Sequence, residues 1–180
     1  MPLPIDEYER RELIDGIIYD MSPSANPYHG IINLNIATSI KTQLKDSLCK
    51  VFMENLDWHY AKDENYVVPD IMIICDIKSL HKGEYKGTPK FIVETLSPAT
   101  AKKDRTIKMK LYASYGVAEY WIVSPKENAI EIYYLKDGEY ELFDTKILVD
   151  DENEKEYNAA DLLMLHEFPN ISIPLKDIFV

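Results

Sequence analysis

Two apolar stretches decide the fold: YVVPDIMIICD at residues 66–76 and FIVETL at residues 91–96. Strands that are apolar on both sides are typical of the buried centre of a sheet. Each stretch also carries one acidic residue next to its apolar core. Asp70 follows Pro69 at the start of the first stretch, and Glu94 follows Val93 in the second. We therefore expect two central strands, each with a carboxylate where the apolar run begins or ends.

The segments around these strands predict a hairpin and two helices. Residues 12–21 read as a β-hairpin, because Asp15-Gly16 suits a type I′ turn. Residues 28–48 carry an apolar residue at every fourth position, which indicates one amphipathic helix. A second helix is expected to open at residues 97–100 and to end at Gly116, a residue type favoured just past helix ends.

The remaining pattern predicts short strands. They are expected at residues 51–54, 58–61, 119–123, 129–135 and 139–143, and Asp137-Gly138 supplies a turn between the last two. The tail at 171–175 is expected to pack on the edge of the fold. The order of hairpin, helix, sheet, helix and sheet predicts an α+β fold with a mixed central β-sheet.

Length and composition fit one ordinary domain. The chain has 180 residues, of which 46% are apolar and 28% charged. One domain commonly has ~100–200 residues, so we expect a single domain over residues 1–180. This composition excludes disordered and collagen-like chains.

The cysteines and the N-terminus point to the cytoplasm. Cys49 and Cys75 form no CxxC pair, so we expect neither a disulfide framework nor a structural zinc site. A reducing compartment is the natural setting for such a chain. Residues 1–7 lack a basic region followed by an apolar core, so we expect no signal peptide. No apolar run approaches the ~18–20 residues that span a bilayer.

The net charge of −11 taken alone argues against a nucleic-acid partner. That charge is unevenly distributed, because residues 78–110 hold nine basic and three acidic side chains and so carry +6. A basic run is often only a solvated face. Phosphate affinity, however, depends on local basic contacts, so we expect weak, salt-sensitive DNA binding through one face. The residues predicted to bind DNA are Lys86, Lys90, Lys102, Lys103 and Arg105.

The carboxylates of Asp70 and Glu94 form the candidate catalytic pair. Neighbouring strands lie ~4.8 Å apart, so two acids in adjacent strands would repel each other unless a divalent cation lay between them. Mg²⁺ or Mn²⁺ suits such a site, because both prefer oxygen ligands. The alternative is that each acid is simply exposed where its strand meets a loop.

Lys108 is the candidate cation near this pair. It shares a helix face with Asp104 and Tyr112, four residues away on either side. A lysine there can orient the attacking water or stabilise negative charge in the transition state. The alternative is a surface ion pair with Asp104, worth ~0.5 kcal/mol.

Taken together, these residues resemble the Uma-type family of putative restriction endonucleases, within the PD-(D/E)XK nuclease superfamily. The central motifs that carry the resemblance are Pro69-Asp70, residues 93–98, Asp104-Arg105, Lys108, Tyr112 and residues 116–123. The two ends of the chain add residues 12–16, residues 21–23, His29, Phe168-Pro169, Ile171 and Ile173.

The resemblance implies a restriction-endonuclease-like mixed sheet flanked by helices, with Asp70 and Glu94 as metal ligands. The superfamily lysine normally stands two residues after the second acid, where this chain has Leu96. The resemblance therefore assigns the lysine role to Lys108. Lys110 is the alternative, rotated by ~200° on the helix. The resemblance also implies Glu12 as a third carboxylate of the site, and it brings His29 to the pocket mouth, where a structural role is the alternative.

These expectations predict a metal-dependent DNA endonuclease that hydrolyses phosphodiester bonds with a metal-bound water as nucleophile. The catalytic residues would be Asp70, Glu94, Lys108 and Glu12. Because duplex cleavage needs two active sites, we expect a homodimer. One alternative is a non-catalytic, nuclease-like DNA-binding or regulatory module. Another is an assembly domain whose interface uses Tyr120-Trp121 and Tyr133-Tyr134.

Overall fold

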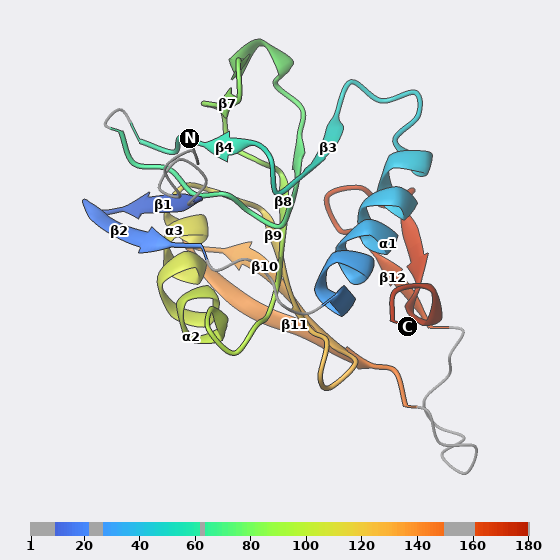
Figure 1. Cartoon of the computed structure of the whole chain (residues 1–180). Coiled ribbons are helices and arrows are strands. Elements are labelled where there is room, and N and C mark those ends of the chain that lie inside the picture. The colour runs from blue at the N-terminus through green and yellow to red at the C-terminus, as the bar shows by residue number, and fades with distance from the viewer. Residues whose placement is uncertain (1–9, 22–26, 62–63, 150–160, 180) are drawn as a thin grey trace, which may run out of the picture.

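The computed structural model describes residues 10–21, 27–61, 64–149 and 161–179 (Figure 1). Its centre is a six-stranded sheet in the order β11-β10-β9-β8-β5-β3. Strands β8 and β9 pair in parallel, and the other pairs are antiparallel, so the predicted mixed sheet is confirmed. The strands are β3 (Lys50–Met53), β5 (Ile71–Ile74), β8 (Phe91–Thr95), β9 (Glu119–Ser124), β10 (Ala129–Lys136) and β11 (Glu139–Ile147).

The two acid-bearing stretches form neighbouring strands, as the sequence predicts. Every residue of β5 and β8 is buried. The strands are antiparallel, with Ile71 opposite Val93. Continuing this register by one residue brings Asp70 opposite Glu94, and directly opposed residues point to the same face of a sheet. The pairing therefore fixes the two carboxylates on one face.

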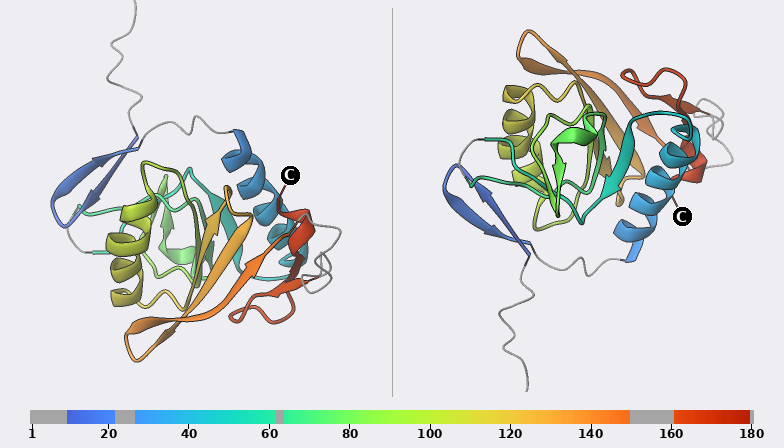
Figure 2. Two further views of the ribbon diagram at one scale, coloured as in Figure 1. Left: turned by 90° about the horizontal axis from the view of Figure 1, so that it is seen from below. Right: turned by 90° about the horizontal axis from the view of Figure 1, so that it is seen from above.

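Two helical segments cover opposite faces of the sheet (Figures 1 and 2). Helix α1 (Pro27–Gln43) packs against Ile71, Ile73 and their neighbours on one face. The second segment runs through α2 (Ala101–Lys103), η3 (Asp104–Lys108) and α3 (Met109–Ser114). It packs on the other face, where Leu111 and Tyr112 join the cluster that holds Met72 and Ile92. Segment η3 is a π-helical turn, which the sequence pattern did not predict.

The predicted bounds of both helices need correction. Helix α1 ends at Gln43, five residues earlier than expected, because the chain turns at residues 44–47 to enter β3. Leu44 is still buried, but Leu48 is 84% exposed. The second helix begins at Ala101, after a turn in which the hydroxyl groups of Ser97 and Thr100 share a hydrogen bond. Its end at Gly116 is confirmed by the positive φ of +77° there.

Both predicted glycine turns are confirmed. Strands β1 (Arg11–Ile14) and β2 (Ile17–Asp20) pair around Asp15-Gly16, whose φ angles are +50° and +76°. Asp137-Gly138 joins β10 to β11 with φ angles of +51° and +87°. A type I′ turn requires positive φ at both central residues.

A small sheet beside the main one was not fully predicted. Its central strand is β7 (Glu84–Tyr85), which pairs with β4 (Asp57–Trp58) on one side and β6 (Leu80–His81) on the other. The short helix η2 (Ile77–Ser79) precedes β6. The strand expected at residues 58–61 is therefore reduced to β4. In the part of the chain described here, β6 and β7 have only two residues each, too few to give an alternating pattern.

The C-terminal tail belongs to the core, and the expectation that it lies at the edge is wrong. Strand β13 (Ser172–Pro174) pairs with β12 (Leu162–Met164), and η4 (Leu175–Asp177) follows. Ile171, Ile173 and Ile178 are each at most 2% exposed and pack with the residues of α1. The tail thus covers the same face of the sheet as α1 (Figure 1).

The cysteines are joined, so the expectation of no disulfide is wrong. Cys49 and Cys75 form a disulfide bond. They flank the paired residues Lys50 and Ile74, so the antiparallel pairing of β3 with β5 sets them opposite each other. The bond also removes the argument from the cysteines for a reducing compartment.

Within the described ranges, no helix has both the length and the apolar character that crossing a bilayer requires. The expectation of no signal peptide concerns residues 1–7, which lie outside those ranges.

Candidate active site

Asp70 lies just before β5 and uses one of its two carboxylate oxygens on the protein. The Thr95 amide donates a 2.7 Å hydrogen bond to Asp70 Oδ2. His29 Nε2 lies 3.2 Å from the same oxygen. Asp70 Oδ1 has no hydrogen-bond partner among the described residues. One oxygen is therefore fixed and the other is available to a ligand.

Glu94, on β8, follows the same pattern. Its Oε1 accepts hydrogen bonds from Lys108 Nζ at 2.9 Å and from the Tyr112 hydroxyl. Its Oε2 has no such partner within the described ranges. Burial raises the pKa of Glu94 well above its ordinary value; Lys108 opposes this rise and the charge of Asp70 adds to it. The site therefore disfavours a second negative charge until a cation compensates it.

Lys108 is surrounded by carboxylates. Its Nζ lies 2.9 Å from Glu94, 2.8 Å from Glu12 and 3.9 Å from Asp104. Burial alone would lower its pKa, but the charges of Glu94, Glu12 and Asp104 raise it well above the ordinary value. Lys108 is 3% exposed and Asp104 is 1% exposed, so the alternative of a surface ion pair is wrong. Lys110, the other lysine considered, is exposed.

Glu12 positions lysines, because both of its oxygens are occupied. Oε1 lies 2.8 Å from Lys108 and accepts a 3.0 Å hydrogen bond from the Val68 amide. Oε2 pairs with Lys103. Burial raises the pKa of this carboxyl, but the two lysines outweigh burial and lower it overall. The saturated contacts favour support of Lys103 and Lys108 over metal ligation.

Asp104 carries an unsatisfied polar atom. Its Oδ1 is buried and has no hydrogen-bond partner in the described part of the chain. Burial raises the pKa of Asp104, and Lys108 offsets only part of this rise. Asp104 begins the π-helical turn η3, and Lys108 ends it. Turns of this kind occur frequently at functional sites.

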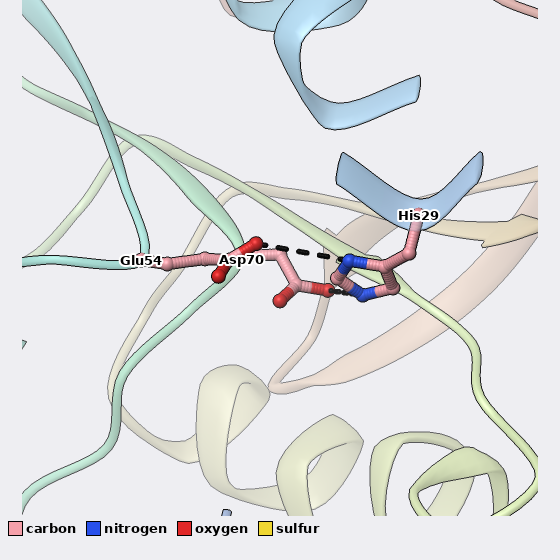
Figure 3. Close-up of side chains that lie close together, drawn as sticks. All are labelled: His29, Glu54 and Asp70. Atoms are coloured by element: carbon pink, nitrogen blue, oxygen red, sulfur yellow. Dashed lines mark ion pairs between the residues drawn. The ribbon is translucent and has the colours of Figure 1, made fainter. Parts of the chain in front are cut away.

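Asp70 also belongs to a second cluster, which it forms with His29 and Glu54 (Figure 3). His29 lies in the first turn of α1, and Glu54 directly follows β3. His29 Nδ1 lies 3.7 Å from Glu54 Oε1, and Asn33 Nδ2 donates a 3.0 Å hydrogen bond to the same oxygen. Burial lowers the pKa of His29, but the hydrogen bond to Asp70 and the charges of Asp70 and Glu54 outweigh burial and raise it.

Reasoning from the sequence missed Glu54 and Asn33 and left His29 open. One signal for Glu54 was present, since it ends an apolar strand in the same way as Glu94. Asn33 gave no signal, because an amide within an amphipathic helix is indistinguishable from a surface residue until its burial is known. In the structure Asn33 is fully buried.

The predicted DNA-binding residues come from three parts of the chain. Lys86 and Lys90 precede β8, four or more residues from Glu94, and Lys86 pairs with Glu84 at 3.0 Å. Lys102 and Lys103 lie on α2. Arg105 lies in η3 and pairs with Glu131 at 2.6 Å.

A cavity of about 360 Å³ lies between β2 and α2. Tyr19, Thr100, Lys102 and Lys103 contribute to its lining. Lys103 Nζ lies 5.4 Å from the centre of the Tyr19 ring and also binds Glu12. Lys103 therefore connects this cavity to the cluster around Lys108.

The mixed sheet, the hairpin and the opposed acids beside a buried lysine define a protein of the restriction-endonuclease-like class. The Uma2 family, described as "Putative restriction endonuclease", matches residues 1–174. The chain belongs to this family, and membership supports a nuclease function in general.

Two individual proteins are similar to this chain. The fold is similar, with a TM-score of 0.73, to the crystal structure of a putative nuclease belonging to DUF820 from Anabaena variabilis. The two are 19% identical over 98% of this chain and 93% of that chain. An uncharacterized protein of Synechocystis sp. is 29% identical over 130 residues, which are 72% of this chain and 68% of its own length.

Proposed function

We propose that this protein is a metal-dependent DNA endonuclease that hydrolyses phosphodiester bonds, with Mg²⁺ or Mn²⁺ held by Asp70 and Glu94. The observation that carries the proposal is the pairing of the two acids. Each fixes one oxygen on protein donors and leaves the other without a partner among the described residues. Two free oxygens on acids that the register of β5 and β8 places on one face of the sheet suit a hard divalent cation.

Family membership supports the reaction class. When bound, such a cation would polarise a phosphate oxygen and lower the pKa of the water that attacks phosphorus. The residues of the chain supply the rest. Thr95 and His29 orient Asp70, while Tyr112 and Lys108 orient Glu94. Lys108 also places a positive charge where negative charge develops on the phosphate in the transition state.

Glu12 acts through the two lysines that it holds. Removing it would leave Lys108 between Glu94 and Asp104 alone and would release Lys103. In this proposal Asp70, Glu94 and Lys108 contact the reacting groups, and Glu12 is a positioning residue.

DNA contacts are proposed for the basic residues near the site. Lys102 is exposed on α2, and Lys103 lies 13% exposed at the cavity beside Tyr19. Lys103 pairs with Glu12, which also holds Lys108 beside Glu94, and this chain of ion pairs supports DNA contacts near the acid pair. The outer contacts in this proposal are Lys86, Lys90 and Arg105. To bind DNA, Lys86 would first release Glu84 and Arg105 would release Glu131.

We further propose that the whole chain forms one nuclease-like domain and that two copies act together on duplex DNA. Two apolar clusters, packed on opposite faces of the same sheet, support the single domain. A two-fold dimer would offer one active site to each strand. Light scattering on the purified chain, alone and with DNA, measures the oligomeric state.

Plasmid cleavage in the presence of Mg²⁺ tests the proposal. Wild type should nick or linearise supercoiled DNA, whereas Asp70→Asn and Glu94→Gln should lose at least about 100-fold in rate, because each removes a charged metal ligand. Glu141→Gln is the matched control and should cleave normally, since the Glu141 side chain pairs with the exposed Lys136 on the hairpin of β10 and β11. Wild type that binds DNA but never cuts it would instead favour a non-catalytic nuclease-like module.

A further inference from the structure

We infer that His29, Glu54 and Asp70 form a second cation site, one that takes a divalent transition-metal ion in preference to Mg²⁺. The inference rests on the proposed function only in that Asp70 is shared with the proposed Asp70–Glu94 pair. The three residues come from separate elements. His29 lies in α1, Glu54 follows β3 and Asp70 precedes β5 (Figure 3).

The spacing of the ligand atoms carries the inference. One potential ligand atom from each residue lies within 4.8 Å of the other two, and no other group of three His, Cys, Asp or Glu residues in the described ranges meets this condition. The separations include 3.2 Å from His29 Nε2 to Asp70 Oδ2 and 3.7 Å from His29 Nδ1 to Glu54 Oε1. One ion uses only one imidazole nitrogen, and ligands ~2.1 Å from that ion lie roughly 3–4 Å apart. The 3.2 Å between His29 Nε2 and Asp70 Oδ2 already meets this spacing, and the Glu54 carboxylate has to close on the same nitrogen to complete the set.

Uncharged neighbours hold the three ligands in place. Asn33 is fully buried, and its amide nitrogen lies 3.0 Å from Glu54 Oε1 and 3.3 Å from His29 Nδ1. The Thr95 hydroxyl donates a 2.6 Å hydrogen bond to Asn33 Oδ1, and the Thr95 amide donates to Asp70. Metal ligands are commonly oriented by such an outer set of hydrogen bonds. Asn33 and Thr95 thus link all three ligands.

The burial of the cluster suits an ion that enters from solvent. The side chains of His29 and Asp70 are 11% and 12% exposed, whereas that of Glu54 is 36% exposed. The two inner ligands are therefore buried, and Glu54 is the ligand that borders solvent.

The donor set determines the kind of ion. Two carboxylates and a neutral imidazole balance the charge of a divalent cation. Imidazole nitrogen suits Co²⁺, Ni²⁺ and Zn²⁺, whereas Mg²⁺ prefers oxygen ligands and retains water. The nitrogen ligand therefore distinguishes this site from the Asp70–Glu94 pair, which offers only oxygen.

A Co²⁺ titration of the full chain in excess Mg²⁺ tests the inference. Binding is followed by calorimetry and by the visible absorption of the ion, and far-UV circular dichroism checks that each variant is folded. Wild type should bind Co²⁺, and His29→Gln and Glu54→Gln should each weaken binding by at least about 100-fold, because even outer-shell changes commonly cost 10–100-fold.

Two control variants should keep Co²⁺ binding. His59→Gln removes a histidine that stacks on Tyr66, away from the cluster. Glu94→Gln removes the acid of the neighbouring pair. Wild type without Co²⁺ affinity, or affinity that is unchanged in both His29→Gln and Glu54→Gln, would overturn the inference and leave His29 as an ion-pair partner of the two acids.

A second measurement uses only the wild-type protein, so it tests the inference even where a variant does not fold. The imidazole resonances of wild type, followed by nuclear magnetic resonance during a Zn²⁺ titration, should shift first and most for His29. A larger response from another histidine would overturn the inference. The two proposals also fail separately. If the protein cleaves DNA with Mg²⁺ but binds Co²⁺ equally well without His29, only the second site is refuted. If Co²⁺ binding depends on His29 but DNA is never cleaved, only the endonuclease is refuted.

Discussion

The Lys108 ammonium lies 2.9 Å from Glu94 Oε1, although the two residues come from a helix and a strand fourteen positions apart. The superfamily pattern places its lysine on the strand itself, where this chain has Leu96. The helical lysine reaches the same acid because α2, η3 and α3 pack across β8 on the face where Glu94 points. The predicted meeting of Lys108 with Glu94 is thus present in the fold.

Replacing Lys108 should affect both activity and stability. Lys108→Met leaves the buried carboxylates of Glu12 and Glu94 without their shared cation, and breaking a buried ion pair costs about 3–5 kcal/mol. Urea unfolding should show a loss of that order, and plasmid cleavage should fall by at least about 100-fold if the lysine acts in the transition state. Lys110→Met, which changes an exposed lysine two residues further along the helix, should leave both unchanged.

Glu119 should make stability depend on pH. It is fully buried, and burial raises the pKa of Glu119 to about 7, although the Glu167 amide and the Trp121 indole both donate hydrogen bonds to it. The folded state therefore holds this proton more tightly than the unfolded state, whose pKa is near 4.5. The contribution is fully present below pH 4.5 and is lost as the pH rises towards 7.

The expected loss across that interval is roughly 3 kcal/mol relative to a chain without this carboxyl. The free energy of unfolding of wild type and of Glu119→Gln, measured by urea titration between pH 4.5 and pH 7.5, gives this difference. If the two proteins show the same pH dependence, Glu119 does not titrate in this range.

The disulfide should contribute measurably to stability. The two cysteines are 26 residues apart, and closing a loop of this size stabilises a fold by roughly 3 kcal/mol. Wild type should lose about that amount when a reductant is added, and the Cys49→Ser, Cys75→Ser double variant should not respond to reductant. A wild-type protein that is insensitive to reductant would show that the bond is not formed in solution.

The basic surface on α2 should govern DNA affinity in a salt-dependent way. Lys102→Gln should weaken binding and reduce the slope of log affinity against log salt by about 1, the value for one lost phosphate contact. Lys136→Gln is the control, because Lys136 pairs with Glu141 at the turn between β10 and β11. Equal slopes for wild type and Lys102→Gln would remove α2 from the DNA surface.

The periodic parts of the sequence predicted the fold well. Residues 71–74 are all apolar and residues 91–93 form an apolar run before Glu94 and Thr95, so their places in the centre of the sheet followed from apolar pattern alone. Asp15-Gly16 and Asp137-Gly138 fixed both turns because few residue pairs tolerate positive φ twice in succession. The spacing of Asp104, Lys108 and Tyr112 likewise predicted one shared helix face.

Features that depend on tertiary pairing could not be predicted from the sequence. The Cys49–Cys75 bond follows from the register of β3 against β5, which no local pattern encodes. The cluster of His29 and Glu54 with Asp70 requires the start of α1 to meet the ends of two strands. The early end of α1 was missed because Leu44 and Leu48 continue the apolar spacing, although only Leu44 is buried.

The rate of plasmid cleavage as a function of Mg²⁺ concentration tests the central claim most directly. Wild type should show no cleavage in chelator and a saturable rise with Mg²⁺, and Glu94→Gln should need far more Mg²⁺ and reach a much lower maximum. Cleavage by wild type that persists in chelator, or a Glu94→Gln protein with the wild-type Mg²⁺ response, would contradict a catalytic cation held by Asp70 and Glu94.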